Sequence, residues 1–258
     1  MKLYFLGTCA GTEPMPTRRH ASVAVESGGA IYFFDAGEGC SITAHLMGMD
    51  LLKVKKIVIS HAHMDHVGGL GNLLWTIRKI IQIKGLEIPY NGDIEVFTPN
   101  MESWNGLMMV LHNSEERFAI KYNVHASEVN GGLLFDDGCL KVTAYPNTHL
   151  KDEEKGKCLS YSYVIESEGK RLVYSGDCGK YADLDPAIAD GCDGLIIETG
   201  HFGIDAVNQY VADKSIGKIF FSHNGREIIN YPEASQQKVK RYFGDRAVIC
   251  EDGMTFAL

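Results

Sequence analysis

Short apolar stretches rich in β-branched and aromatic residues recur along this chain and alternate with segments of helical pattern. Two of them, at 22–26 and 30–34, flank a Ser-Gly-Gly sequence, which is typical of a β-hairpin. An earlier apolar run predicts a strand at 2–6, and a loop punctuated by Gly and Pro follows it. This opening region is therefore predicted to form three strands.

The rest of the chain alternates helices and strands. Helices are predicted at 41–49, at about 69–83 and near 203–214. Further strands are predicted at 57–60 and near 94–97, 139–145, 159–166, 170–175, 194–198 and 218–222. Strand-rich halves with helices outside them predict two packed sheets flanked by helices.

The segment 101–130 has no clean period, which leaves open a helical lid or an irregular insertion over a functional site. Its residues Trp104, His112 and Tyr122 are candidates for a substrate wall or for ordinary packing. The chain has no linker, low-complexity tract or obvious repeat, so residues 1–258 are predicted to form a single domain.

Composition is that of a soluble globular protein, with 45% apolar and 22% charged residues. The first apolar run is too short for a signal-peptide core, and no run approaches a membrane span. The seven cysteines are odd in number and contain no C-x-x-C pair, so reduced thiols are expected. These features predict a cytoplasmic protein that does not use a membrane.

The formal net charge of −8 affects the choice of partner. A negative surface repels long polyanions, so an extended nucleic acid is not expected as a partner. A small anionic substrate remains compatible, because a metal site supplies its own positive field. The oligomeric state is left open, a homodimer included.

The sequence from Ser60 to Gly69 carries the clearest chemical signal. His61 and His63 follow a buried strand, and side chains two positions apart in an extended segment share a direction, so both can bind one ion. Asp65 and His66 come after the chain turns and can face a second ion. Imidazole and carboxylate suit zinc, iron or manganese, and the absence of cysteine argues against a closed structural zinc site.

This His-x-His-x-Asp-His motif resembles the signature of the metallo-β-lactamase-like hydrolases, and the other landmarks of that superfamily occur in order. They are Asp35 after an apolar strand, His149 in Asn-Thr-His, Asp177 in Tyr-Ser-Gly-Asp, and His223 in Phe-Ser-His. The resemblance covers nearly the whole chain. It implies an αββα sandwich of two mixed β-sheets flanked by helices.

The resemblance also implies a site with two divalent transition-metal ions, zinc before manganese or iron. The first ion would be bound by His61, His63 and His149, and the second by Asp65, His66 and His223, with Asp177 shared by both. Asp35 would orient the ligand loop by hydrogen bonds. Asp65 would also take part in catalysis, and a metal-bridging hydroxide would be the nucleophile.

Two further features indicate a branch of the superfamily. Residues 6–22 resemble the opening of ribonuclease Z and of related cyclic phosphodiesterases. His201 lies 22 positions before His223, and in both groups a histidine at this spacing contacts the scissile phosphate. By resemblance, His201 would stabilise the phosphorane or protonate the leaving oxygen. Glu198 would orient His201 or serve as a structural partner.

The length of the interval between His149 and Asp177 distinguishes ribonuclease Z from the cyclic phosphodiesterases, and here it is only 28 residues. It is too short for the tRNA-grasping arm that common ribonuclease Z proteins carry there. The sequence therefore predicts a phosphodiesterase for a small phosphodiester, such as a cyclic phosphate or cyclic nucleotide. The alternatives are a ribonuclease Z-like tRNA 3′-processing endonuclease, a lactone hydrolase and a non-catalytic metal-binding protein.

Overall fold

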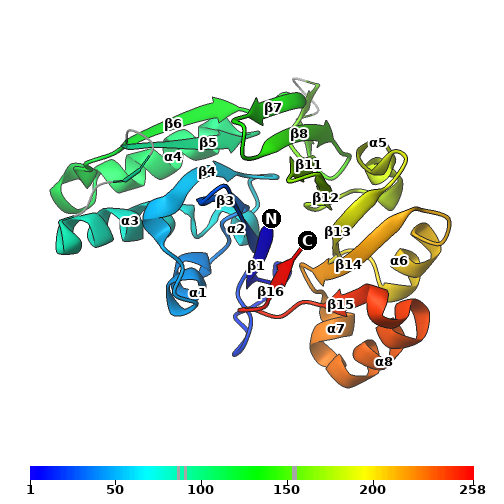
Figure 1. Ribbon diagram of the computed structural model, residues 1–258. Coiled ribbons are helices and arrows are strands. Elements are labelled where there is room, and N and C mark those ends of the chain that lie inside the picture. Colours follow the sequence, from blue (N-terminus) through cyan, green and yellow to red (C-terminus); the bar gives the residue numbers. More distant parts are fainter. Residues whose placement is uncertain (86–87, 90–91, 153–155) are drawn as a thin grey trace.

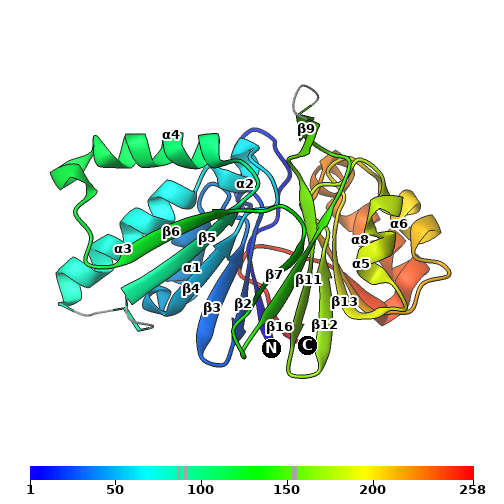
Figure 2. The ribbon, with the colours of Figure 1, turned by 90° about the horizontal axis from the view of Figure 1, so that it is seen from above.

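Two seven-stranded sheets face each other, and helices cover the outer side of each (Figures 1 and 2). The computed structural model describes residues 1–85, 88–89, 92–152 and 156–258. Each large sheet has three antiparallel pairings at one side and three parallel pairings at the other. The predicted αββα sandwich of two mixed sheets is confirmed.

The first sheet has the strand order β16-β1-β2-β3-β4-β5-β6. Its strands are β1 (Lys2–Gly7), β2 (Ser22–Ser27), β3 (Ala30–Phe34), β4 (Val54–Val58), β5 (Asp93–Thr98), β6 (Asn123–Glu128) and β16 (Thr255–Ala257). The helices of this half are α1 (Cys40–Leu46), α2 (Met64–Val67), α3 (Leu70–Lys84) and α4 (Met101–His112).

The second sheet has the order β15-β14-β13-β12-β11-β8-β7. Its strands are β7 (Gly132–Asp136), β8 (Lys141–Pro146), β11 (Tyr161–Ser167), β12 (Lys170–Tyr174), β13 (Cys192–Glu198), β14 (Ile216–Ser222) and β15 (Ala247–Ile249). Its helices are α5 (Asp185–Ile188), α6 (Ile204–Tyr210), α7 (Arg226–Asn230) and α8 (Pro232–Phe243). A separate pair consists of β9 (Lys151–Asp152) and β10 (Lys157–Cys158).

Strand side chains alternate between two buried layers. In β1, Leu3 and Phe5 belong to the core between the sheets, whereas Tyr4 and Leu6 belong to the core under the first helical layer. A third core lies between the second sheet and α5–α8. Because both faces of the central strands are covered, these strands are apolar almost throughout, and all five residues of β3 are buried.

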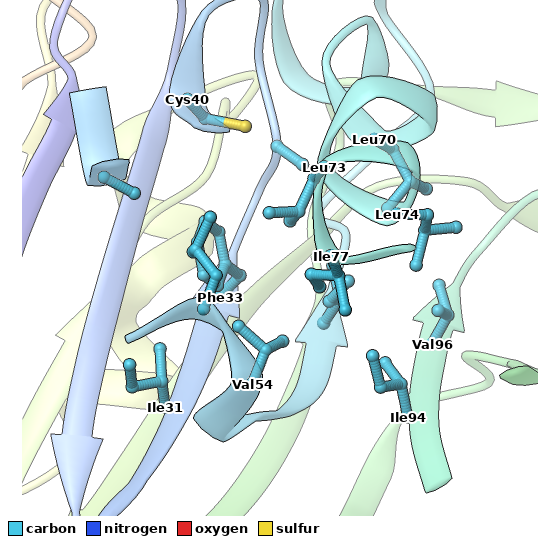
Figure 3. Close-up of a cluster of buried hydrophobic side chains, with 14 of the residues drawn as sticks. Ile31, Phe33, Cys40, Val54, Leu70, Leu73, Leu74, Ile77, Ile94 and Val96 are labelled. Carbon is cyan, nitrogen blue, oxygen red and sulfur yellow. The ribbon is translucent and has the colours of Figure 1, made fainter. Parts of the chain in front are cut away.

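Helix α3 packs its apolar face on the first sheet. Leu73 and Ile77 of this helix belong to one buried cluster with Phe33 of β3 and Val54 of β4 (Figure 3). These positions recur at helical spacing, which is why the sequence predicted this helix to within a residue at each end.

The segment 101–130 is part of the first half of the fold rather than an irregular insertion. It contains α4 and the edge strand β6, and Trp104 and Tyr122 pack into the first core. Tyr122 also donates a hydrogen bond of 2.6 Å to the carbonyl of Leu74 in α3. These two residues are therefore packing residues and not a substrate wall.

Several elements were absent from the sequence prediction. They are β6, β7, β15, β16, α2, α4, α5, α7 and α8 together with the short pair β9–β10. Helices α1 and α6 also end three or four residues before the predicted limits, at Leu46 and Tyr210. Among the residues that the structure describes, no helix is long and apolar enough to cross a membrane.

Candidate metal centre and active site

The predicted site residues gather at one edge of the two sheets because each follows the carboxyl end of a strand. In the second sheet, β12, β13 and β14 are parallel, and β8 runs in the same direction because β11 is antiparallel to both β8 and β12. Chain segments that leave these strands therefore emerge at one edge. His149 follows β8, Asp177 follows β12, and His223 follows β14.

The first sheet supplies the remaining ligand-type residues. His61 and His63 lie in the loop after β4, while Asp65 and His66 lie in α2. His63 stands at the amino end of α2, where its carbonyl accepts hydrogen bonds of 3.0 Å from the amides of His66 and Val67. The turn that the sequence predicts between His61 and His63 on one side and Asp65 and His66 on the other is thus the start of α2.

Three overlapping groups of four side chains have possible ligand atoms that all lie within 4.8 Å of one another; one consists of Asp177, Glu198, His201 and His223, and the predicted ligands form the other two. Of these two, the first group is His61, His63, His149 and Asp177, and the second is Asp65, His66, Asp177 and His223. Asp177 Oδ2 lies 3.7 Å from His61 Nε2, and Asp177 Oδ1 lies 3.3 Å from His66 Nε2. The two oxygens of this carboxylate therefore face different groups.

Distances between the nitrogen atoms fit metal coordination. His61 Nε2 lies 3.0 Å and His149 Nε2 lies 3.3 Å from His63 Nδ1. Tetrahedral ligands on zinc, at about 2.0–2.1 Å from the ion, stand about 3.3 Å apart. Imidazoles that converge at this spacing can bind a common cation. This His/Asp cluster is typical of a dinuclear metal site.

Buried polar atoms without hydrogen-bond partners support the same reading. Among the described residues, they include His66 Nε2, Asp177 Oδ1 and His223 Nδ1, all in the second group. An unpaired buried polar atom is costly, so such atoms are rare unless a ligand satisfies them. His63 is exposed and opens the cluster to solvent, which provides a path of entry.

Asp35 is fully buried beneath the second group and binds the ligand loop directly. Its Oδ1 accepts a hydrogen bond of 2.6 Å from the amide of Ser60. Its Oδ2 lies 2.7 Å from His66 Nδ1 and accepts hydrogen bonds of 2.7 Å from Ser60 Oγ and Tyr174 OH. With Nδ1 of His66 engaged in this way, Nε2 is directed toward the cluster.

The pKa directions show which groups carry protons in the metal-free protein. Burial is the largest single effect on His66 and His223 and opposes their charge. Asp177 together with the other nearby carboxylates outweighs it, so the pKa of His223 rises to about 9 and that of His66 rises well above its usual value. Burial instead lowers the pKa of His61 well below its ordinary value, and the nearby His66 adds to this effect. Protons on His66 and His223 therefore compete with cations.

Glu198 and His201 form a third feature beside the cluster. His201 Nδ1 lies 2.7 Å from Glu198 Oε2, and this oxygen also accepts a hydrogen bond of 3.1 Å from the amide of His201. The hydrogen bond with Glu198 is the main reason why the pKa of His201 is raised, against the effect of burial. Glu198 itself is buried at the carboxyl end of β13, whereas His201 is partly exposed.

The cluster lines a cavity of about 340 Å³. His63, Asp65, Asp177, His201 and His223 all contribute to its wall. The remaining lining residues are Ala10, Gly11, Thr12, Gly200, Gly225 and Arg226. Of the described residues in 101–130, none lines this cavity, so this segment does not form part of the cavity wall.

A family model described as Anti-Pycsar protein Apyc1 matches residues 1–192. The chain belongs to this family. The match includes every predicted ligand from His61 to Asp177. Glu198, His201 and His223 lie beyond it, so their assignment depends on the geometry of the second sheet.

Relatives of this Apyc1-family chain include ribonucleases. Ribonuclease BN of Cronobacter sakazakii is 34% identical over 177 residues, which cover 66% of this chain and 51% of that protein. The chain spans about half the length of the curated relatives it matches.

Solved structures agree on the fold. The short form of human tRNase Z aligns with 100% of this chain and over 99% of its own chain, with a TM-score of 0.73 and 20% sequence identity. The metallo-β-lactamase fold protein YhfI of Bacillus subtilis has a TM-score of 0.75 at 16% identity, with 99% of this chain and 98% of that chain covered. The chain therefore has the metallo-β-lactamase fold.

Sequence reasoning missed three residues that shape this site. Ser60 and Tyr174 bind Asp35, and both stand next to or within the ligand motifs, which was the available signal. Arg226 lines the cavity and stands only three positions after His223.

Proposed function

We propose that this protein is a dinuclear metal-dependent phosphodiesterase that hydrolyses a small cyclic nucleotide. The observation that carries the proposal is the pair of four-residue groups sharing Asp177, with His201 on the same cavity wall. The matching family, Apyc1, is one of cyclic nucleotide phosphodiesterases. A cavity of about 340 Å³ is at the lower end of the range of roughly 300–1,000 Å³ for small-molecule sites.

Zinc is the proposed metal, because each of the two groups contains four nitrogen or oxygen side chains and no thiolate, and the imidazoles of the first group stand near tetrahedral spacing. When bound, two divalent ions would supply activation of water at neutral pH and polarisation of a phosphoryl oxygen. His61, His63 and His149 would hold the first ion. Asp65, His66 and His223 would hold the second, with Asp177 common to both.

The protein side chains then have distinct tasks. Asp65 lines the cavity and accepts a proton from the attacking water. As the new phosphorus–oxygen bond forms, the bond to the leaving oxygen breaks, and His201 donates a proton to that oxygen. Because Nδ1 of His201 is engaged by Glu198, Nε2 is the atom that meets the substrate. The raised pKa of His201 favours the protonated form that this task requires.

A hydrolysis screen of purified, metal-analysed protein tests the proposal. It should contain 2′,3′- and 3′,5′-cyclic nucleotides, bis-p-nitrophenyl phosphate, a lactone, a thioester and a tRNA precursor. We expect turnover of cyclic nucleotides and of the chromogenic diester. Turnover of the lactone or thioester alone would refute the phosphodiesterase assignment, and an intact metal pair without any turnover would indicate a metal-binding protein.

A tRNA 3′-processing endonuclease is the second candidate, because relatives such as ribonuclease BN are named for ribonuclease activity. Strands β11 and β12 already occupy much of the short interval between His149 and Asp177. An enzyme that grips tRNA through phosphates loses affinity steeply as salt rises. We expect no tRNA binding at moderate salt, and a precursor cleaved to its mature 3′ end would favour this second candidate.

A further inference from the structure

An exposed ion pair stands at the edge of the candidate active site. Arg226 is the only lysine or arginine among the described residues that line the cavity with the His/Asp cluster. Its guanidinium group meets the carboxylate of Glu13 in a two-point contact, with Nη1 3.0 Å from Oε1 and Nη2 bonded to Oε2. Glu13 lines a neighbouring cavity rather than this one.

The main chain on both sides of this pair is anchored to the metal centre. The amide of Asn224, next to His223, donates a hydrogen bond of 2.7 Å to the carbonyl of Thr8. The amide of Ala10 donates one of 3.1 Å to the carbonyl of Asn224. The loop that carries Glu13 and the start of α7, which carries Arg226, are thereby held together beside a predicted ligand, while both side chains reach solvent.

The contact between Glu13 and Arg226 is exchangeable. The side chain of Arg226 is 50% exposed and that of Glu13 is 62% exposed, so solvent screens the pair. A planar carboxylate that meets a guanidinium at two points has the same geometry as two oxygens of a phosphoryl group. A substrate phosphoryl group can therefore take the place of the Glu13 carboxylate.

We propose that Arg226 binds the non-bridging oxygens of the substrate phosphoryl group, and that Glu13 holds Arg226 in the free protein and competes with the substrate. This inference rests on the proposed function, because the anion that it assigns to Arg226 is a phosphoryl group. Arg226 then supplies substrate affinity, and Glu13 reduces that affinity.

The two partners should consequently have opposite effects. Glu13→Gln releases Arg226, so the KM for bis-p-nitrophenyl phosphate should fall. The expected decrease is about 2–5-fold, because an exposed ion pair contributes a free energy that corresponds to a factor of this size. Arg226→Gln should raise KM by about 10-fold, which corresponds to the lower end of the free energies that hydrogen bonds to charged groups contribute. Arg226→Lys should raise KM nearly as much, because a lysine does not form the two-point contact. The kcat values should change by less than about 2-fold, since the contact is present before and during reaction.

Inorganic phosphate provides a readout that does not depend on turnover. Calorimetric titration of the metal-loaded protein should show a lower Kd for phosphate in Glu13→Gln and a higher Kd in Arg226→Gln. Asp245→Asn is the matched control, because Asp245 also pairs with a basic residue, Lys240, and lines neither cavity. It removes the same unit of negative charge and should leave KM and Kd unchanged.

A structural ion pair would behave differently. If both Glu13→Gln and Arg226→Gln weaken phosphate binding to the same extent, or if neither changes it, the proposal is wrong. An equal increase in phosphate affinity in Asp245→Asn and Glu13→Gln would also overturn the proposal, since net charge would then explain the effect. Failure of the wild type to hydrolyse any phosphodiester would refute the proposed function, while the phosphate titrations would still decide the roles of Arg226 and Glu13.

Discussion

Asp177 is the residue on which the dinuclear proposal depends most directly. Its two oxygens face different groups of histidines, and its side chain is buried. The two surrounding groups draw its pKa well below the usual value despite burial, so the carboxylate is charged whenever the protein is folded at neutral pH. In the metal-free protein, protonated His66 and His223 compensate this charge, and a bound cation would take the place of their protons.

Asp177→Ala should therefore lower the metal content from nearly two ions per chain to about one or fewer. The physical reason is that only this side chain belongs to both groups. Elemental analysis of the folded variant, with circular dichroism to verify folding, measures the change. Asp190→Ala removes an exposed carboxylate from the surface and should retain both ions. An intact pair of ions in Asp177→Ala would show that Asp177 does not bridge them.

His201 allows a second test at the residue scale. His201→Ala should keep the metal content, because the proposed ligand groups of both ions are complete without it, and should lower kcat by about 10²–10⁴-fold for a cyclic nucleotide. The loss should be smaller for bis-p-nitrophenyl phosphate, because p-nitrophenolate leaves with little protonation. Equal losses for both substrates would indicate phosphate binding instead of acid catalysis. Loss of metal would make His201 a ligand or a structural residue.

At the scale of elements, the position of α2 determines the second ligand group. Gly69 follows α2, and its amide donates a hydrogen bond of 2.8 Å to the carbonyl of Ala36. A Cβ atom on Gly69 would lie 2.2 Å from the carbonyl oxygen of Gly37. Only glycine allows this approach, which places Asp65 and His66 against the loop that carries Asp35.

Gly69→Ala should thus push α2 away from the Asp35 loop. We expect the free energy of unfolding to fall by about 1–3 kcal/mol, as for other overpacked sites, with weaker metal binding. Urea denaturation and metal titration measure the two effects. Gly106→Ala is the matched control, since a Cβ atom there meets no atom within 4 Å, and it should stabilise α4 by about 0.5–1 kcal/mol. Unchanged metal affinity in Gly69→Ala would show that this contact does not position α2.

At the scale of the whole molecule, metal binding should couple to stability and pH. The pKa of His223 is raised to about 9 from the ordinary value of 6.5, so its proton stabilises the metal-free protein below pH 6.5 and this contribution disappears as pH rises through 9. Over the same range, fewer protons compete with the metal.

The increase in Tm caused by zinc should therefore grow between pH 6.5 and 9. At a free zinc concentration of about 100 times Kd, zinc binding adds about 2.7 kcal/mol to the free energy of unfolding. In a protein of this size, this raises Tm by about 5–10 °C. Thermal unfolding of chelator-treated and reloaded protein provides the measurement. A zinc effect that is absent, or that is equal at both pH values, would contradict the proposed proton–metal exchange.

The elements that the sequence predicted well are those with one strong pattern. Strands β1, β2 and β3 are short, nearly continuous buried runs because both of their faces are covered, and helix α3 repeats apolar positions at helical spacing. Helix α8 escaped prediction because only Ser235, Val239 and Phe243 are buried on it. In α4, exposed Met109 and Val110 obscure the period of the residues that face the core.

The sequence by itself determined which side chains could bind metal and in what order they occur, because ligand chemistry depends on residue type and on local spacing. The tertiary structure alone decided that His149, Asp177 and His223 meet the cluster after β4, since that requires the common direction of β8, β12 and β14. It alone also decided that Arg226 faces Glu13, 213 positions away in the chain. Contacts between distant loops depend on how strands pair and sheets pack, and neither leaves a periodic pattern in the sequence.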